Sequence, residues 1–241
     1  MRESTTPTVV LVHGAFADAS SWSGVIADLQ DHGIPVVAPP NPLRGLASDA
    51  AYISSVAAQI DGPVVLVGHS YGGAIITVAG TTDNVVGLVY VAAYALEENE
   101  SLGELQGRFA EPPLATSLRT TTYPVPGGEP AVEFTIVPQA FPTVFAADVP
   151  VEVTTVLAVA QRPLAAVAFT EPATAAAWRT KPSWAVIATG DQAINPQVQR
   201  FGAERAGATI VEVGGASHAV AVSRPKEVAD VIRDAVRAGT A

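Results

Sequence analysis

The sequence predicts an α/β protein with a mainly parallel, six-stranded sheet that helices cover on both faces. Its short apolar runs have strand length and are continuous rather than alternating in polarity, which is typical of strands buried on both faces. Stretches with helical periodicity separate these runs along much of the chain. One run ends in Gly68-His69-Ser70-Tyr71-Gly72, a G-x-S-x-G pattern that a further helical stretch follows.

Six apolar runs are expected to form the strands of the sheet, in an order that alternates with helices. The expected strands are residues 8–12, 34–38, 63–68, 85–92, 183–189 and 209–213. The expected helices, where apolar residues recur at three- and four-residue spacing, are residues 20–31, 49–59, 71–80, 196–206 and 224–238.

The alternation stops between residues 97 and 182. This segment is rich in Pro, Thr, Ala and Glu and has helix-like patches around residues 101–109, 139–147, 150–160 and 171–178. It contains no buried strand followed by a helix. We therefore expect residues 97–182 to form a mostly helical cap, inserted into a core made of residues 1–96 and 183–241.

The composition of the chain argues against several kinds of binding partner, covalent chemistry and targeting segment. The net charge is −10, and no basic patch is visible, which argues against nucleic acids and anionic membranes as partners. The absence of cysteine excludes disulfides and thiolate nucleophiles. Residues 1–7 lack the apolar core of a signal peptide, and no run approaches the roughly 18 apolar residues of a membrane span. We expect a cytoplasmic protein that is a monomer or a homodimer.

The G-x-S-x-G pattern makes Ser70 a candidate nucleophile, which needs a base and an acid that orients the base. His218 follows the last expected strand, and Asp191 follows the strand at 183–189. Catalytic groups of parallel sheets lie on such loops at the carboxyl ends of strands. We therefore expect Ser70, Asp191 and His218 to form a catalytic triad, in the chain order Ser, Asp, His.

Other histidines and acids are weaker candidates for these roles. Beside Ser70, His69 is expected to pack next to the turn, and His13 is expected to be structural. Because His32 ends a polar helical face, we expect it to be solvated. As the acid, Glu97 or Glu98 is the alternative to Asp191, with Asp148 a more remote one. Asp191 itself has a second interpretation, as the residue that shapes a turn.

Two backbone N–H groups are needed to bind the oxyanion that forms during acyl transfer. One is expected from Tyr71, the residue after the nucleophile. The other is expected from the turn at 13–16, from Ala15, because Gly14 lets the backbone approach closely. Phe16 is expected to pack over the acyl site. The alternative is that this turn only joins a strand to a helix.

With these residues in place, the chain resembles the α/β-hydrolases, and more closely their small-esterase branch, which includes plant methylesterases and hydroxynitrile lyases. The resemblance lies in Val-Leu-Val-His-Gly-Ala at 10–15 with Trp22, Gly-His-Ser-Tyr-Gly-Gly at 68–73, Gly190-Asp191 followed by Pro196, and Gly-Ala-Ser-His at 215–218. It covers most of the chain outside the cap. It implies catalysis without a cofactor or a metal ion.

Departures from that branch favour hydrolysis. Its lyases carry a threonine after the first-strand histidine and a lysine after the catalytic histidine, whereas this chain has Gly14 and Ala219. The resemblance therefore implies a carboxylesterase-like serine hydrolase. The alternatives are a ligand-binding protein that keeps the triad but turns over slowly, and a non-hydrolytic triad enzyme such as a lyase, a cofactor-free oxygenase or a perhydrolase.

Aromatic residues of the cap suggest an apolar inner surface, and pockets of this kind are mostly apolar. Together with Phe16, the candidate substrate-binding residues are Phe134, Phe141, Phe145 and Phe169. The alternative is that each of them only seals the cap onto the core. The expected substrate is a small to medium ester, thioester or lactone with a hydrophobic part.

Overall fold

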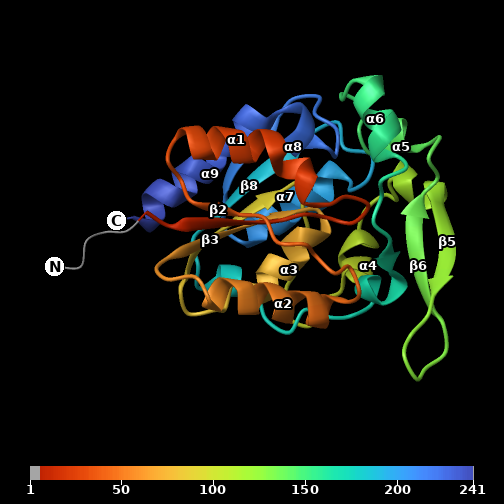
Figure 1. Ribbon diagram of the computed structural model, residues 1–241, viewed down its shortest axis with the longest axis horizontal. Coiled ribbons are helices and arrows are strands. Elements are labelled where there is room, and N and C mark those ends of the chain that lie inside the picture. Colours follow the sequence, from red (N-terminus) through yellow and green to blue (C-terminus); the bar gives the residue numbers. More distant parts are fainter. Residues whose placement is uncertain (1–5, 241) are drawn as a thin grey trace.

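A six-stranded parallel sheet forms the centre of the computed structural model, which describes residues 6–240 (Figure 1). Its strand order is β2-β1-β3-β4-β8-β9. The strands are β1 (Thr8–Val12), β2 (Val36–Val37), β3 (Val64–His69), β4 (Val85–Val91), β8 (Ser183–Ala188) and β9 (Thr209–Val213). The fold class and the six expected strands are confirmed, although the second strand is shorter than expected.

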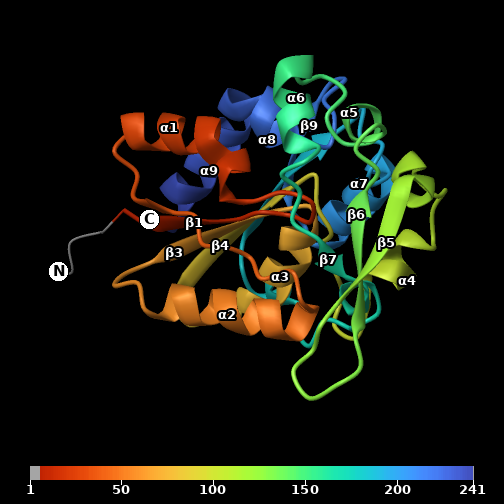
Figure 2. The same ribbon diagram turned by 45° about the vertical axis from the view of Figure 1, so that its right-hand side comes forward.

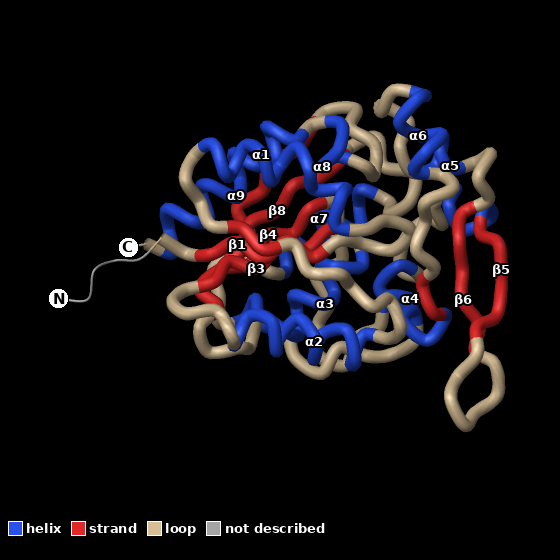
Figure 3. The backbone as a smooth tube through the Cα atoms, viewed as in Figure 1, coloured by secondary structure: helices blue, strands red, loops and turns tan. Residues whose placement is uncertain are grey.

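Helices cover both faces of this sheet, which explains why its four inner strands, β1, β3, β4 and β8, are almost entirely buried. On one face lie α1 (Ser23–Asp31), α8 (Val220–Ser223) and α9 (Pro225–Gly239). On the other lie α2 (Leu46–Ala58), α3 (Tyr71–Ala79) and α7 (Pro196–Arg205). Figures 1 and 3 show α1 and α9 above the sheet and α2 and α3 below it. In β3, Val65 and Val67 pack toward α9, and Val64 and Leu66 pack toward α3.

Residues 97–182 lie mostly beyond the carboxyl ends of the strands (Figure 2), and the 3-10 turn at Ala177–Arg179 runs back beside α3 before β8 begins. They form α4 (Leu102–Gln106), α5 (Phe141–Val144), α6 (Val151–Leu157), short 3-10 turns, and an antiparallel sheet of β5 (Leu118–Tyr123), β6 (Ala131–Ile136) and β7 (Leu164–Ala165). The expectation of a mostly helical segment is therefore incomplete. The expected helix at 171–178 is also wrong, because only Ala177–Arg179 there form a 3-10 turn.

The β5–β6 hairpin follows from its residues. Thr120, Thr121 and Thr122 are β-branched and suit an extended backbone. The link from β5 to β6 contains Gly127, whose φ of +72° favours glycine. Prolines on both sides of that link end the strands, because proline donates no hydrogen bond to a ladder. Two β-rich runs around a Pro- and Gly-rich link are the signal that indicates a hairpin here.

The strand order places one crevice at the carboxyl ends of β1 and β3. After β1 the chain turns outward to β2 at the edge, whereas after β3 it continues to β4 on the other side. Loops that leave two adjacent parallel strands in opposite directions open a crevice between them, where ligands of such sheets bind. Val12 pairs with Gly68 in this register, so the turn at His13 and the turn at Ser70 are neighbours.

Within residues 6–240, no helix combines the length and the apolar character needed to cross a membrane. The expectation that residues 1–7 do not form a signal peptide falls largely on residues 1–5, which lie outside the described part of the chain.

Candidate active site

Ser70 occupies a sharp turn between β3 and α3. Its φ of +57° and ψ of −121° are costly for a residue with a side chain. Glycines on both sides permit the turn. A Cβ atom on Gly68 would collide with the backbone of Gly72, and a Cβ atom on Gly72 would collide with the carbonyl oxygen of Val12. The turn holds Ser70 where the strand ends, which is the geometry of a nucleophile elbow.

A continuous chain of hydrogen bonds joins Ser70, His218 and Asp191. The Nε2 atom of His218 lies 2.8 Å from Ser70 Oγ, and its Nδ1 atom lies 2.6 Å from Asp191 Oδ2. A carboxylate only accepts, so Nδ1 carries the proton and Nε2 is left to accept the Ser70 hydroxyl. All three residues are buried. The structure thus brings together the three side chains that the sequence predicts to act together.

Three donors besides His218 hold the carboxylate of Asp191. Its Oδ1 atom accepts the backbone N–H groups of Ala193 and Ile194 at 2.7 and 2.9 Å. Its Oδ2 atom also accepts Nε2 of Gln199, a buried residue of α7, at 2.7 Å. Donors aimed at a carboxylate stabilise its ionised form. Gln199 carries no sequence signal for this contact, because a glutamine in a helix is usually exposed.

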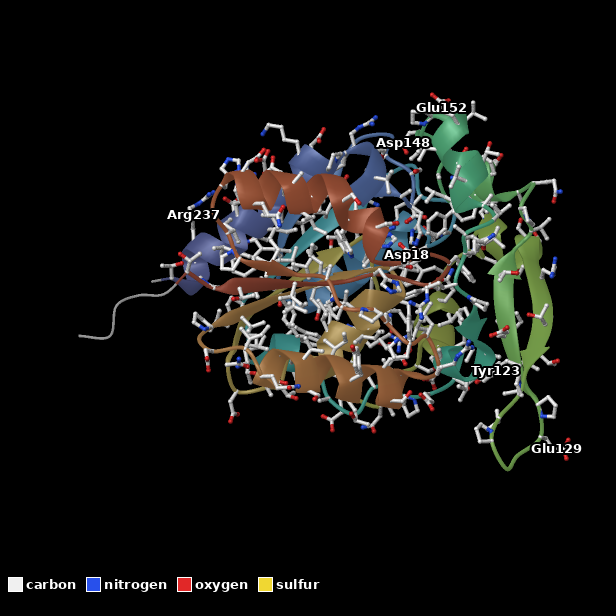
Figure 4. All side chains as sticks on the ribbon, in the orientation of Figure 1. Asp18, Tyr123, Glu129, Asp148, Glu152 and Arg237 are labelled. Atoms are coloured by element: carbon white, nitrogen blue, oxygen red, sulfur yellow. The ribbon has the colours of Figure 1, made fainter. Side chains whose placement is uncertain are left out.

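The loop around His218 is fixed at three successive residues. The backbone carbonyl of His218 accepts a hydrogen bond from Nε2 of His69 at 2.9 Å. Before it, the Ser217 hydroxyl donates to Asp148. After it, the Ala219 N–H donates to the carbonyl of Phe145 at 2.9 Å. Figure 4 shows Asp148 on the side of the molecule that carries α6 and Glu152. Two of the three anchors therefore come from residues 97–182.

His69 and His13 are buried and serve as hydrogen-bond scaffolds near the site. Burial, with repulsion from His218, holds the pKa of His69 well below its usual value. Burial also lowers the pKa of His13, despite its hydrogen bond to the Gly14 carbonyl. The Nε2 atom of His13 accepts the N–H of Asn41 at 2.9 Å, which fastens the turn after β1 to the loop after β2.

The carboxylates considered as alternatives to Asp191 have other partners than His218. Glu97 forms an ion pair with Arg179, with 2.9 Å between Oε1 and Nη2. Asp148 contacts Ser217 and Arg224 rather than His218. Asp191 is thus the carboxylate that is hydrogen-bonded to His218.

Two backbone N–H groups lie at the site without an acceptor among residues 6–240. They belong to Ala15 and Tyr71, and both residues line the same small pocket as Ser70. The N–H of Phe16 is occupied, because it donates to the carbonyl of Arg162 at 3.1 Å. Of the two residues of this turn that line the pocket, Ala15 and Phe16, Ala15 is therefore the one with a free donor.

Tyr71 is anchored by a buried carboxylate, Asp49, which the sequence analysis did not select as a site residue. Its hydroxyl donates to Asp49 Oδ2 at 2.9 Å, and Asp49 lies in the first turn of α2. Burial raises the pKa of both groups, with Asp49 adding to the effect on Tyr71. The signal is a carboxylate on the apolar face of a helix, between Leu46 and Ile53.

Two apolar cavities adjoin the site. A pocket of about 30 Å³ covers Ser70 and His218, and Phe16, Phe145 and Phe169 contribute to its walls. A larger cavity of about 110 Å³ is lined by Phe141 as well as by Phe16 and Phe145. Four of the five aromatic candidates thus line a cavity.

Phe134 is the exception among the aromatic candidates. It lines neither cavity and instead packs against Phe169, with 6.0 Å between ring centroids. Its position in β6 places it behind the residue that reaches the pocket. The sequence does not separate these two roles, because both need a large apolar side chain.

Among the described residues, no three His, Asp or Glu side chains form a group that could hold a metal ion. The side chains of Ser70, His218 and Asp191 are hydrogen-bonded to one another, and Asp191 also accepts the donors described above.

A family comparison agrees with this geometry. The family model described as "Alpha/beta hydrolase family" matches residues 9–231. The chain belongs to the alpha/beta hydrolase family. The matched range includes strands β2 to β9, the segment between β4 and β8, and all of β1 except its first residue, Thr8. No curated protein matches the sequence.

Several solved structures share this fold over nearly their whole length. Polyneuridine aldehyde esterase superposes with a TM-score of 0.82 at 22% identity, covering 95% of this chain and 99% of that one. A methylesterase from Arabidopsis gives 0.79 at 18% identity, with 96% and 99% covered. A pyrethroid hydrolase from Sphingobium faniae JZ-2 gives 0.76 at 22% identity, with 97% and 98% covered.

Proposed function

We propose that this alpha/beta hydrolase is a serine hydrolase that cleaves a carboxylic ester or lactone with a hydrophobic part. The observation that carries the proposal is the unbroken hydrogen-bond chain from Asp191 through His218 to Ser70 at a strained turn. A serine hydroxyl becomes a good nucleophile only when an oriented base can take its proton, and this arrangement supplies both.

In the first half of the proposed reaction, Ser70 Oγ attacks the ester carbonyl carbon while Nε2 of His218 takes the hydroxyl proton. The carbonyl oxygen becomes an oxyanion, which accepts the N–H groups of Ala15 and Tyr71. When the intermediate collapses, the bond from the carbonyl carbon to the alkoxy oxygen breaks. His218 then gives its proton to the departing alcohol, and an acyl group remains on Ser70.

In the second half, water replaces the alcohol. His218 takes a proton from the water, whose oxygen attacks the acyl carbon, and the same two N–H groups bind the new oxyanion. The bond to Ser70 Oγ breaks, His218 returns the proton to Ser70, and the carboxylic acid leaves. Asp191 holds the imidazole in one orientation and stabilises its charged form during both halves.

The similar structures favour an esterase over other members of the fold. Their titles name a polyneuridine aldehyde esterase, a pyrethroid hydrolase and a methylesterase. We also propose that residues 97–182 act as a cap on the site, because they supply Leu102, Leu114 and Leu164 to the pocket over Ser70. That pocket is apolar apart from the reacting groups, which supports an uncharged substrate.

Cyanohydrin cleavage is less well supported than hydrolysis. A Cβ atom at Gly14 would lie 2.7 Å from the Ser70 Cβ atom, so a threonine does not fit there without displacement of the nucleophile. Ala219, next to His218, carries no charged group that could bind cyanide. Release of cyanide from mandelonitrile at a rate comparable with ester hydrolysis would contradict this assignment.

Substitution of the nucleophile tests the proposal directly. We expect Ser70→Ala to lower kcat for p-nitrophenyl acetate by at least about 1,000-fold, since loss of the nucleophile removes the acyl-enzyme route. The matched control is Ser54→Ala in α2, which should keep the wild-type rate. A fluorophosphonate probe should label wild type and not Ser70→Ala. Equal hydrolysis by wild type and Ser70→Ala would sink the proposal, as would tight ligand binding without turnover.

A further inference from the structure

Two separate apolar cavities meet at the candidate site, and among the described residues only two line both of them. The pocket over Ser70 measures about 30 Å³, and the neighbouring cavity about 110 Å³. The shared side chains are Phe16 and Phe145. The two phenyl rings therefore form the wall between a small space at the nucleophile and a larger space beside it.

The lining residues distinguish the two spaces by their place in the reaction. The small pocket is lined by Ser70 and His218 and by the two residues with free N–H groups, Ala15 and Tyr71, so the carbonyl group of an ester must lie there. The larger cavity is lined instead by His69 and Ala219. His69 precedes the nucleophile, and Ala219 follows His218. The larger cavity thus lies on the side of the imidazole against which the rings of His69 and Phe145 pack, whereas His218 itself lines the small pocket.

That side is where the departing oxygen must lie. The alcohol leaves only when His218 Nε2 gives its proton to the alkoxy oxygen, so this oxygen must approach the imidazole. The imidazole packs edge-on against Phe145, with 4.8 Å between ring centroids, and it lies 4.7 Å from the ring of His69. A group attached to the alkoxy oxygen therefore points at Phe145 and at the cavity behind it.

The chemistry of the larger cavity selects an uncharged hydrophobic group. Its inner wall includes Phe141, Leu157 and Val222, whereas Asp18 contributes a carboxylate. Hydrogen bonds from Ser20 lower the pKa of Asp18, which keeps it ionised and disfavours an anionic group. The volume of 110 Å³ is somewhat less than the roughly 150 Å³ of an engineered cavity that binds benzene.

The two rings of the wall differ in their aromatic contacts, although both are buried. Phe145 is held by a stacked contact with Phe141 and by edge contacts with His69 and His218. Phe16 makes no ring contact within residues 6–240, and its φ of +62° is unusual for a bulky residue. Rotation of this one side chain would join the two cavities, while its backbone N–H stays on the carbonyl of Arg162.

We propose that the larger cavity is the alcohol site, which receives a hydrophobic alkoxy group of about benzyl size, and that the pocket over Ser70 takes a short acyl group. The proposal rests on the proposed ester hydrolysis and adds the direction in which the substrate lies. The substrate class is then a short-chain carboxylic ester of a hydrophobic alcohol, rather than a simple alkyl ester of a bulky acid.

A pair of isomeric esters tests this direction. Benzyl acetate places the ring on the alcohol, and methyl phenylacetate places the same ring on the acid. We expect kcat/KM of the wild-type enzyme to be at least about tenfold higher for benzyl acetate, because its ring fills the larger cavity in the transition state. Equal values, or a preference for methyl phenylacetate, would overturn the proposal.

Substitutions that fill only the larger cavity sharpen the test. Ala160→Trp adds a ring at an exposed position of the wall, and Val222→Phe adds one from α8. Each should lower kcat/KM for benzyl acetate at least about tenfold and change that for methyl phenylacetate less than about twofold. Ala51→Trp, at an exposed position of α2, is the control and should alter neither value.

The outcomes separate the two proposals. If wild type hydrolyses both esters, Ser70→Ala hydrolyses neither, and both cavity variants lower the two rates equally, the alcohol site is wrong while ester hydrolysis stands. If wild type hydrolyses neither these esters nor p-nitrophenyl acetate, ester hydrolysis is wrong and the alcohol site falls with it.

Discussion

At the scale of single residues, the site depends on buried hydrogen bonds that reach the candidate triad from several elements. Gln199 illustrates this. Its Nε2 atom donates to Asp191 Oδ2 and to the carbonyl of Ile194, and its Oε1 atom accepts the N–H of Ala188. One side chain from α7 thus ties the end of β8 to the carboxylate that orients His218. We infer that Gln199 is a positioning residue.

Replacement of Gln199 by leucine should lower kcat for p-nitrophenyl acetate about tenfold and change KM less than about twofold. Asp191 then loses one hydrogen-bond donor and holds the His218 imidazole less firmly in the transition state, while the substrate pocket is unchanged. The variant should also unfold about 1–3 kcal/mol more easily, since buried partners stay unpaired. Steady-state kinetics and urea unfolding measure both effects.

Gln197→Leu is the matched control, because Gln197 lies on the same helix with an exposed side chain. It should keep wild-type kcat and stability within about 0.5 kcal/mol. A Gln199→Leu enzyme with unchanged kcat but reduced stability would leave Gln199 with a structural role alone.

At the scale of elements, the turn at Ser70 depends on close contact between the backbones of β1, the end of β3 and the start of α3. The turn at Ser70 brings the first residues of α3 against the end of β1, and Gly72 is the residue where they touch. Its missing side chain therefore sets the distance from α3 to the sheet, and with it the position of Ser70 relative to the turn that carries Ala15.

We expect Gly72→Ala to destabilise the protein by about 1–3 kcal/mol or more, because the new methyl group overlaps the Val12 carbonyl oxygen and pushes α3 away from β1. The displacement should also misalign Ser70 and lower kcat at least about tenfold. Thermal unfolding and ester kinetics report the two changes. Gly214→Ala serves as the control, since nothing lies within 4 Å of a Cβ atom there. Wild-type stability in Gly72→Ala would contradict the close contact.

The elements differ in how far the sequence predicts them. The four inner strands were predictable because burial on both faces forces continuous apolar runs, whereas the edge strands β2 and β9 are partly exposed. Ser70 and Asp191 were predictable because each follows an inner strand, and His218 because it follows β9. The β5–β6 hairpin is half exposed, so many of its residues are polar and the alternation of apolar and polar residues along its strands is weak. The contact of Asp49 with Tyr71, like that of Gln199 with Asp191, depends on tertiary packing between elements distant in sequence.

At the scale of the whole molecule, two buried histidines link the site to acid stability. The folded protein disfavours protonation of His13 and His69, whereas the unfolded chain binds those protons near pH 6.5. The folded-state pKa values are lowered, so the stabilising effect is complete above pH 6.5 and is lost as the pH falls below it. The free energy of unfolding should decline there, by up to about 1.4 kcal/mol per pH unit for His69, whose pKa lies well below its usual value.

His69→Gln should remove one histidine from this decline and still offer an N–H donor to the His218 carbonyl. We expect its free energy of unfolding to fall less steeply between pH 6.5 and 5, by about 1.4 kcal/mol per pH unit relative to wild type. Urea unfolding at a series of pH values measures the slope. An unchanged slope in His69→Gln would show that His69 does not contribute.

The anchoring of the His218 loop by Asp148 and the Phe145 carbonyl has a consequence for protein engineering. Residues 97–182 are not an interchangeable module that could be swapped for the corresponding segment of a relative to alter substrate preference. A chimaera that lacks an acceptor for Ser217 and one for the Ala219 N–H would inherit the host's triad residues but not their alignment. Grafts should therefore retain residues 145–148 and exchange only the sequence on either side.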